Sequence, residues 1–453
     1  MSGRARRALP EAGCFLIVAA AYGVHFALSG YDRFYWDAQH YWELGHEFSR
    51  NGSFTPLEFD DPIRPYALPL LCYGLQSVAD LIGVSDVTIM RIWGALLAAT
   101  LGVLVAPRLA RALFPGAAIG WWRVIALNGL VFLFWRDHFQ FPLSDFPALL
   151  LASIAVIGFL RATPVGYVVA GAGFGLAAMV RPSYSFAAIA AVVAAAVRER
   201  SGSLLRGVVA PALVLVAVAL VSLPQVAINH HHRGTWSPGV PEASETTLIV
   251  LRLGLVAQRA QTYVGPPQRY PSQLVLYHDP IGKRILDGRT VSSVTSNGDY
   301  ARLVLANPPL AVASYALHVF NGLDVRYPTP YVRDLGERPL VLPVLGFTLL
   351  FLAVARLALP SARNALGDIR WIGIVLLLVP LLSVVAIPVD PRYYVSLHLL
   401  VYMLACFGPS NATSLLGGGR RRLLAIGLSY LVLLVVCLGL ASAIEAQLEF
   451  SLD

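Results

Sequence analysis

The sequence predicts an all-α protein that crosses a membrane many times. Hydrophobic residues make up 57% of the 453 residues, and charged residues only 13%. Soluble domains usually carry about a quarter charged residues, so most of this surface suits lipid rather than water. The composition excludes a disordered chain. It also excludes a disulfide scaffold, because all four cysteines lie within apolar stretches, where a free thiol behaves as a small hydrophobe.

The net charge of +8 does not indicate a nucleic-acid partner. The arginines occur singly or in short clusters between the apolar runs. In membrane proteins such clusters mark the cytoplasmic loops. We therefore expect membrane lipid, and no nucleic acid, around this chain.

About eleven apolar runs approach the roughly 20 residues that a spanning helix needs. Arg4, Arg6 and Arg7 precede the first run, which predicts a cytoplasmic N-terminus, and alternation then places every strong arginine cluster on the cytoplasmic side. A signal peptide cleaved after Ser29 is the alternative for the first run. An uncleaved helix is favoured because everything downstream is also membrane. The runs fall at about 12–29, 88–107, 118–135, 143–160, 165–180, 183–197, 206–225, 340–358, 371–388, 393–409 and 421–443.

The segment 66–84 is apolar enough to span, but Pro69 and Gly74 predict a break in it. Counting it as a span would put the later arginine clusters outside. We therefore interpret it as a re-entrant or interfacial helix.

The predicted topology divides the chain into three parts. An N-terminal transmembrane module, 1–226, is followed by a long non-cytoplasmic loop region, 227–339, and by C-terminal transmembrane helices, 340–453. The stretch 301–320 could form a surface helix that breaks at Pro308-Pro309.

The first outer loop, 30–65, contains a short amphipathic stretch that suits a helix lying in the interface plane. Its apolar face would carry Tyr41, Leu44 and Phe48, and its polar face Glu43, His46, Glu47 and Arg50. Asp37 lies just before this stretch, at the exit of the first span. An aspartate is favoured there as a helix N-cap, which is the structural alternative to a role in chemistry.

The same loop resembles the first outer loop of GT-C glycosyltransferases. The closest likeness is to the family 39 protein mannosyltransferases and the lipid A aminoarabinose transferases, which show an acidic residue, a tyrosine, a Gly-containing turn and a Lys-Pro-Pro-Leu-like element. Here the stretch from Asp37 to Phe54 precedes Arg64-Pro65-Tyr66-Ala67-Leu68-Pro69. The family's usual Asp-Glu pair is Asp37-Ala38 in this chain, and Arg64 stands at the lysine position.

Three further motifs follow in the family's order, all on the predicted outer face. They cover most of the chain, although 227–339 resembles no known region. They are Leu143-Ser144-Asp145-Phe146-Pro147, Val180-Arg181-Pro182 and Val389-Asp390-Pro391-Arg392-Tyr393-Tyr394.

The resemblance implies an enzyme that moves a sugar from a polyprenyl-phosphate donor to a hydroxyl of a glycan, lipid or protein acceptor. The acceptor needs a base within hydrogen-bond reach, and Asp37 is the matched position, with Asp145 as a second acid. Arginine binds phosphate bidentately. The candidates for the donor phosphate are Arg64, Arg181 and Arg392, and those for other substrate contacts are Tyr41, Trp36 and Tyr393.

Two of these candidates have structural alternatives. Asp145 could instead pair with Arg136 or Arg181, and Arg392 could pair with Asp390.

No cofactor is expected, and a divalent metal is not indicated. The Asp60-Asp61 doublet resembles a pair of metal ligands, but two carboxylates in a turn are more often solvated. The three histidines 230–232 do not share one helix face, so their geometry for zinc is poor.

A secondary transporter and a non-catalytic lipid- or glycan-handling protein are the competing hypotheses. Against a transporter, the chain shows no internal repeat of paired broken helices, and the candidate charges gather at one membrane face. A non-catalytic role is compatible with the loss of one acid at Asp37-Ala38.

We predict that the 227–339 region lies on the non-cytoplasmic side. A cysteine introduced at Ser237 or Ser293 should therefore react with an impermeant maleimide added outside intact cells, because the arginine clusters alternate correctly only in that orientation. Labelling from the cytoplasmic side alone would overturn this topology and the location of the site.

Overall fold

Helices make up most of the protein, as the composition predicts. The computed structural model describes residues 5–114, 116–200, 204–266, 274–335, 339–358, 368–408 and 419–449. The chain forms two compact units. The first comprises 1–241, 358–380 and 402–409, and the second comprises 242–357, 381–401 and 410–453.

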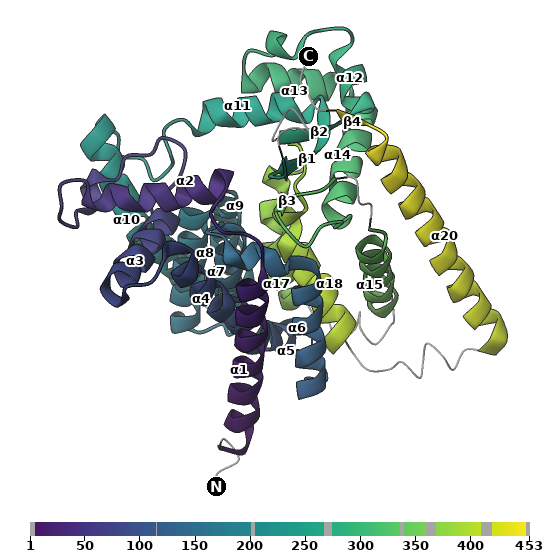
Figure 1. Cartoon of the computed structure of the whole chain (residues 1–453), viewed down its shortest axis with the longest axis horizontal. Coiled ribbons are helices and arrows are strands. Elements are labelled where there is room, and N and C mark those ends of the chain that lie inside the picture. Colours follow the sequence, from purple (N-terminus) through teal and green to yellow (C-terminus); the bar gives the residue numbers. More distant parts are fainter. Residues whose placement is uncertain are drawn as a thin grey trace. The chain divides into compact units, whose positions relative to one another are not determined.

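The described residues of the first unit form helices and connecting loops, with no strand among them (Figure 1). A π-helical segment, Thr100–Val105, joins α4 and α5 into one continuous helix. The helices are α1 (Ala5–Leu28), α2 (Trp36–Gly45), α3 (Ala67–Ile82), α4 (Asp86–Ala99), α5 (Ala106–Leu113), α6 (Trp121–Trp135), α7 (Asp145–Leu160), α8 (Pro164–Val180), α9 (Ser185–Glu199), α10 (Leu204–Arg233) and α17 (Asp368–Leu378). Short 3-10 turns lie at His46–Ser49, Pro56–Glu58, Arg136–Gln140 and Pro182–Tyr184.

Helix α8 packs closely between α7 and α10, and glycines make that packing possible. A Cβ on Gly171 would lie 2.3 Å from the Val214 carbonyl oxygen of α10, and one on Gly173 would lie 2.9 Å from Ala155 Cβ of α7. Small residues allow membrane helices to approach in this way. The three helices therefore form a tightly packed layer. This packing holds the start of α7 and the end of α8 in place.

The second unit combines helices with a small sheet in the order β3-β1-β2-β4. Strand β1 pairs antiparallel with β2 and parallel with β3, and β2 pairs antiparallel with β4. The strands are β1 (Ala257–Tyr263), β2 (Leu274–His278), β3 (Tyr331–Val332) and β4 (Leu448–Glu449). The helices include α11 (Ala243–Gly254), α12 (Pro280–Leu286), α13 (Asn297–Ala306), α14 (Pro308–Leu323), α15 (Val341–Leu357) and α20 (Gly419–Glu445). Helix α18 (Val395–Phe407) begins in this unit and ends in the first.

The region 227–339 was predicted as loops with surface helices, and the sheet within it was not predicted. Strand β1 shows no alternation of apolar and polar residues in the sequence, because its buried side chains include Gln258, Arg259 and Gln261. The buried Arg259 guanidinium lies 3.5 Å from Asp324 Oδ2. Pairing between distant residues, rather than apolar periodicity, therefore accounts for this strand.

Every apolar run of the sequence contains a helix, but the helices differ in length. Among the residues that the structure describes, four are long and apolar enough to cross a bilayer: Pro10–Leu28, Asp86–Leu113, Leu205–Arg233 and Leu423–Glu445. The pair α13 and α14, bent by 107°, would make a fifth span. Several other apolar helices have only 10–17 residues. The protein is thus helical and has several candidate spans. The number of eleven spans stays a prediction.

The expected break in the segment 66–84 is wrong. Residues Ala67–Ile82 form one helix, α3. Pro69 lies in its first turn, where a missing N–H costs nothing, and Gly74 is tolerated inside it. Whether α3 lies in the interface stays a prediction.

Two local predictions are confirmed. In the first outer loop Tyr41, Leu44 and Phe48 are buried, while the polar side of the same stretch is largely exposed. The helix predicted over 301–320 breaks at Asn307, directly before Pro308, where α13 ends and α14 begins.

Candidate functional site

Residues from three of the four motifs meet around Tyr41, which is buried in the middle of α2. The Arg64 guanidinium lies 4.7 Å from the centre of the Tyr41 ring. Burial raises the pKa of the Tyr41 hydroxyl, and the charge of Arg64 opposes that rise. Asp37 and Arg181 also act on this hydroxyl by charge, and Ser144 forms a side-chain hydrogen bond with it. We call Asp37, Tyr41, Arg64, Asp145 and Arg181 the Tyr41 cluster.

Asp37 pairs with Arg64 instead of capping its helix. The N-cap of α2 is Tyr35, whose side chain makes no capping bond, and Asp37 lies in the first turn. An Arg64 NH2 group donates to Asp37 Oδ1 at 2.7 Å. The N-cap alternative for Asp37 is therefore wrong, although its carboxylate still faces the favourable end of the helix dipole.

Asp145 and Arg181 form the second ion pair of the cluster. The alternative partner, Arg136, instead donates to the Leu133 carbonyl oxygen at 3.1 Å. Prolines determine where Asp145 and Arg181 lie relative to their helices. Pro182 keeps Arg181 in an extended conformation (φ −146°, ψ 110°) and so ends α8. Pro147 lies in the first turn of α7, which Asp145 begins.

The two acids differ in their access to solvent. The Asp37 side chain is 44% exposed, while that of Asp145 is only 1% exposed. A molecule in the solvent could reach the Asp37 carboxylate without rearrangement. Asp145 is paired with Arg181 and almost fully buried, so a solvent molecule could reach its carboxylate only after a local rearrangement.

The backbone is strained directly beside Asp37. Trp36 has a φ of 44°, in the left-handed region that non-glycine residues avoid. Such a conformation costs on the order of 1–3 kcal/mol, and it is found most often at functional sites. The Trp36 side chain is 46% exposed, so it is available to a ligand beside Asp37.

Two side chains that sequence analysis did not assign to the site hold its parts in place. Asp61 accepts hydrogen bonds from the backbone N–H groups of Ile63 (2.8 Å) and Arg64 (2.5 Å), which fixes the turn that presents Arg64. An aspartate that bonds to a backbone two or three residues later is a recognised turn signal, so this role was detectable. Ser144, next to Asp145, accepts a hydrogen bond at its Oγ from Arg181 Nη1 (3.5 Å).

The Asp60-Asp61 doublet acts in ion pairs and turns in this structure. Asp60 Oδ1 lies 2.6 Å from an Arg233 NH2 group of α10. Within the described part of the chain, no group of three or more His, Cys, Asp or Glu side chains could hold a metal ion.

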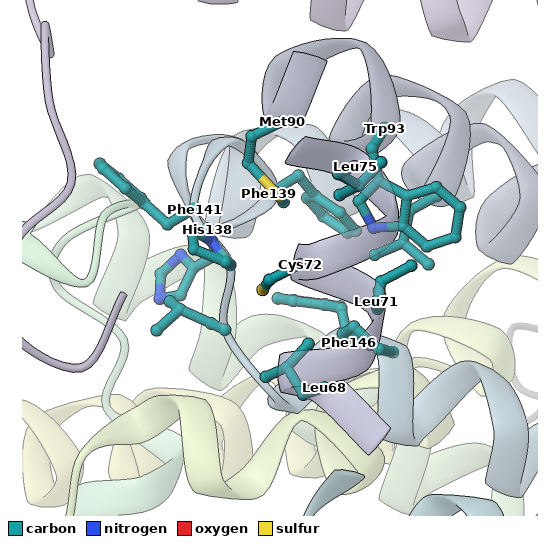
Figure 2. A pocket seen from close by; sticks show the side chains of 14 residues that line it. Leu68, Leu71, Cys72, Leu75, Met90, Trp93, His138, Phe139, Phe141 and Phe146 are labelled. Carbon is teal, nitrogen blue, oxygen red and sulfur yellow. The ribbon is translucent and has the colours of Figure 1, made fainter. Parts of the chain in front are cut away.

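An apolar cleft is lined by residues that are close in sequence to Arg64 and Asp145 of the Tyr41 cluster. It is lined from α3, α4 and the segment leading into α7, and Figure 2 shows the side chains of all three facing one another across it. Phe146 adjoins Asp145 in sequence, and Leu68 follows Arg64 by four residues. The cleft is narrow, with a volume of about 10 Å³, which is room for about one water molecule. The lining residues include Leu68, Leu71, Cys72, Leu75, Met90, Trp93, His138, Phe139, Phe141 and Phe146.

Arg392 and Tyr393 lie in the second unit, in the 3-10 turn Pro391–Tyr394. Arg392 Nε lies 2.9 Å from Asp390 Oδ2, so the structural alternative for Arg392 is present. The Arg392 guanidinium is also 5.6 Å from the centre of the Tyr393 ring. That Arg392 and Tyr393 act in one site with Arg64 stays a prediction.

No protein-family model matches the chain, and no curated protein matches it. The likeness to GT-C enzymes therefore rests on the four motifs of the sequence.

We expect the Asp145–Arg181 pair to matter chiefly for keeping the cluster folded. Asp145→Ala should lower the free energy of unfolding by about 3–5 kcal/mol, because it leaves the largely dehydrated Arg181 guanidinium without its carboxylate. The double variant Asp145→Ala/Arg181→Met should recover most of that loss, since neither charge remains. Thermal unfolding in detergent would measure both, with the exposed Glu43→Ala as control. Equal stability of the Asp145→Ala variant and the control would contradict this role.

Proposed function

We propose that this protein is a membrane glycosyltransferase of the GT-C type. It would move a sugar from a polyprenyl-phosphate donor to a hydroxyl of a glycan, lipid or protein acceptor. The observation that carries the proposal is the Tyr41 cluster, in which Asp37, Arg64 and Arg181 act by charge on the Tyr41 hydroxyl, and Asp145 pairs with Arg181. These residues are 27 and 36 positions apart within their pairs, so their meeting is independent of the local motifs.

The arginines support a phosphate ligand. Arg64 and Arg181 are 19% and 15% exposed, so each guanidinium is close to the surface but largely dehydrated. Weak hydration strengthens the attraction between a guanidinium and a phosphate oxygen. Arg64 is the more available of the two for a ligand, because its carboxylate partner, Asp37, is itself exposed.

The apolar cleft supports a donor that carries a lipid tail. A polyprenyl phosphate has a charged head and a hydrocarbon chain. The cleft offers the apolar side chains of Leu68, four residues after Arg64, and of Phe146, directly after Asp145. Because the cleft is narrow, α3 or the side chains of Phe139 and Phe146 would have to move to admit an isoprene unit.

The proposed reaction uses Asp37 as the base. The acceptor oxygen bonds to the anomeric carbon of the sugar, and the bond from that carbon to the donor phosphate oxygen breaks. The acceptor proton passes to the Asp37 carboxylate, while Arg64 and Arg181 stabilise the charge that develops on the departing phosphate. When the phosphate engages Arg64 it takes over the contact that Asp37 makes there, which frees the carboxylate for proton transfer.

The proposal includes the predicted topology. About eleven spans from a cytoplasmic N-terminus would put the Tyr41 cluster at the non-cytoplasmic face, where α1 ends and α7 begins. Asp145 begins α7 and Arg181 directly follows α8. In the predicted topology these helix ends lie at a membrane face, which favours transfer at a surface over transport across the bilayer.

Substitution of Asp37 tests the chemical step. Asp37→Asn keeps the size of the side chain but removes the base, so the transfer rate should fall by roughly 10²–10⁴-fold with donor binding nearly unchanged. The rate would be measured with purified protein and a polyprenyl-phosphate sugar, with the exposed Asp32→Asn of the same loop as control. A near-normal rate for the Asn variant would remove Asp37 from the mechanism and make Asp145 the next candidate base.

Substitution of the arginines tests the donor site. Arg64→Ala and Arg392→Ala should each weaken donor binding and lower turnover without unfolding the protein, and Arg→Lys should restore only part, because lysine lacks the bidentate fork. Arg50→Ala, an exposed arginine of the same outer loop, is the control. Unchanged donor affinity in both Ala variants would leave the phosphate site without support.

A further inference from the structure

A second groove lies at the other end of α1 from Asp37. It opens between the start of α1, helix α5 and the start of α6, and its volume is about 460 Å³. Pro10 lines the groove, and α1 runs from there to Leu28, a rise of about 27 Å. The groove and the Tyr41 cluster are therefore separated by about the thickness of a bilayer core.

The groove combines a cationic wall with an apolar floor. Arg108 and Arg111 lie three residues apart on α5, so they share one helix face, and both are exposed. The floor includes the buried residues Cys14, Val103 and Val124. A soluble anion would gain nothing from this floor, whereas an amphipathic anion would use both parts.

A carboxylate now holds one of the two arginines. An Arg108 NH2 group donates to Glu11 Oε2 at 3.0 Å, and both side chains are about half exposed. An exposed pair of this kind contributes little stability, so a phosphate could displace Glu11 at low cost.

The continuous helix formed by α4 and α5 departs from α-helical geometry beside the groove. The segment Thr100–Val105 is π-helical, and Val103 within it lines the groove. A Cβ on Gly102 would lie 2.0 Å from Asn128 Oδ1 of α6, so the two helices touch closely there. Single π-helical turns inside α-helices occur frequently at functional sites.

Two exposed tryptophans lie beside the groove. Trp121 and Trp122 begin α6, are exposed, and stack with their ring centres 3.6 Å apart. Trp121 lines the groove. Exposed tryptophans at helix ends are typical of the headgroup level of a bilayer, where a lipid phosphate is found.

We propose that this groove binds an anionic phospholipid of the membrane, with the lipid phosphate between Arg108 and Arg111 and the upper part of an acyl chain on the apolar floor. The site is separate from the proposed donor site, because it lies at the opposite end of α1. It therefore does not depend on the glycosyltransferase proposal.

The test compares an anionic with a zwitterionic lipid that carries the same acyl chains. Purified full-length protein in detergent is titrated with phosphatidylglycerol or phosphatidylcholine, each brominated in its acyl chains, and quenching of tryptophan fluorescence reports binding. The wild type should prefer phosphatidylglycerol by roughly 30-fold, because each of the two arginines contributes about 1 kcal/mol near an anionic headgroup and about 1.4 kcal/mol is a factor of ten. Inorganic phosphate and glycerol phosphate should not displace the lipid.

Variants assign this preference to the groove. Arg108→Gln/Arg111→Gln should bind the two lipids about equally, while Arg161→Gln/Arg200→Gln, which removes two exposed arginines elsewhere in the unit, should keep the preference. Glu11→Gln should increase the preference for phosphatidylglycerol, because it removes the competing carboxylate. This variant keeps both arginines, so it still tests the site if the double arginine variant does not fold.

The proposal would be overturned by equal binding of both lipids to the wild type, by an unchanged preference in the Arg108→Gln/Arg111→Gln variant, or by no increase in the Glu11→Gln variant. Displacement by glycerol phosphate would show a soluble anion site instead.

Discussion

Pairing between arginines and carboxylates is the interaction on which the rest of this protein depends. The chain has few charged residues, yet it buries several of them, and a buried charge is tolerated only beside an opposite one. Asp145 meets Arg181 in the first unit, and Asp324 lies against Arg259 and Arg326 in the second. Such pairs add little net stability, but removing one partner is costly. They therefore fix geometry more than they strengthen the fold.

In the Tyr41 cluster the paired acids lie in the first turns of α2 and α7. The layer of α7, α8 and α10 itself is packed with small and apolar residues. Gly171 and Gly173 bring these helices close, so their ends are held rigidly. Pro147 lies in the first turn of α7, and Pro182 follows the end of α8, so these two prolines set where the helices begin and end. A charged cluster beside an apolar cleft is the result, and this combination suits a ligand that is itself part ionic and part hydrocarbon.

The two proposed sites use the same chemistry at the two ends of α1. Each sets arginines beside apolar side chains, which is the arrangement that a lipid phosphate requires. They differ in what accompanies the arginines. Near Arg64 stand an accessible carboxylate and a strained backbone at Trp36, whereas Arg108 has only an exposed glutamate that a ligand can displace. The first arrangement is suited to proton transfer, and the second to holding a lipid.

The helical class, the amphipathic stretch after α1 and the break at Pro308 were determined by the sequence alone, because apolar periodicity and proline geometry act over a few neighbouring residues. The tertiary structure alone decided that Asp37 pairs with Arg64, that Asp145 is buried while Asp37 is exposed, and that β1 joins a sheet. These features depend on which distant residues the packing brings together, and on how much water the packing leaves around them. Local propensity carries no information on either.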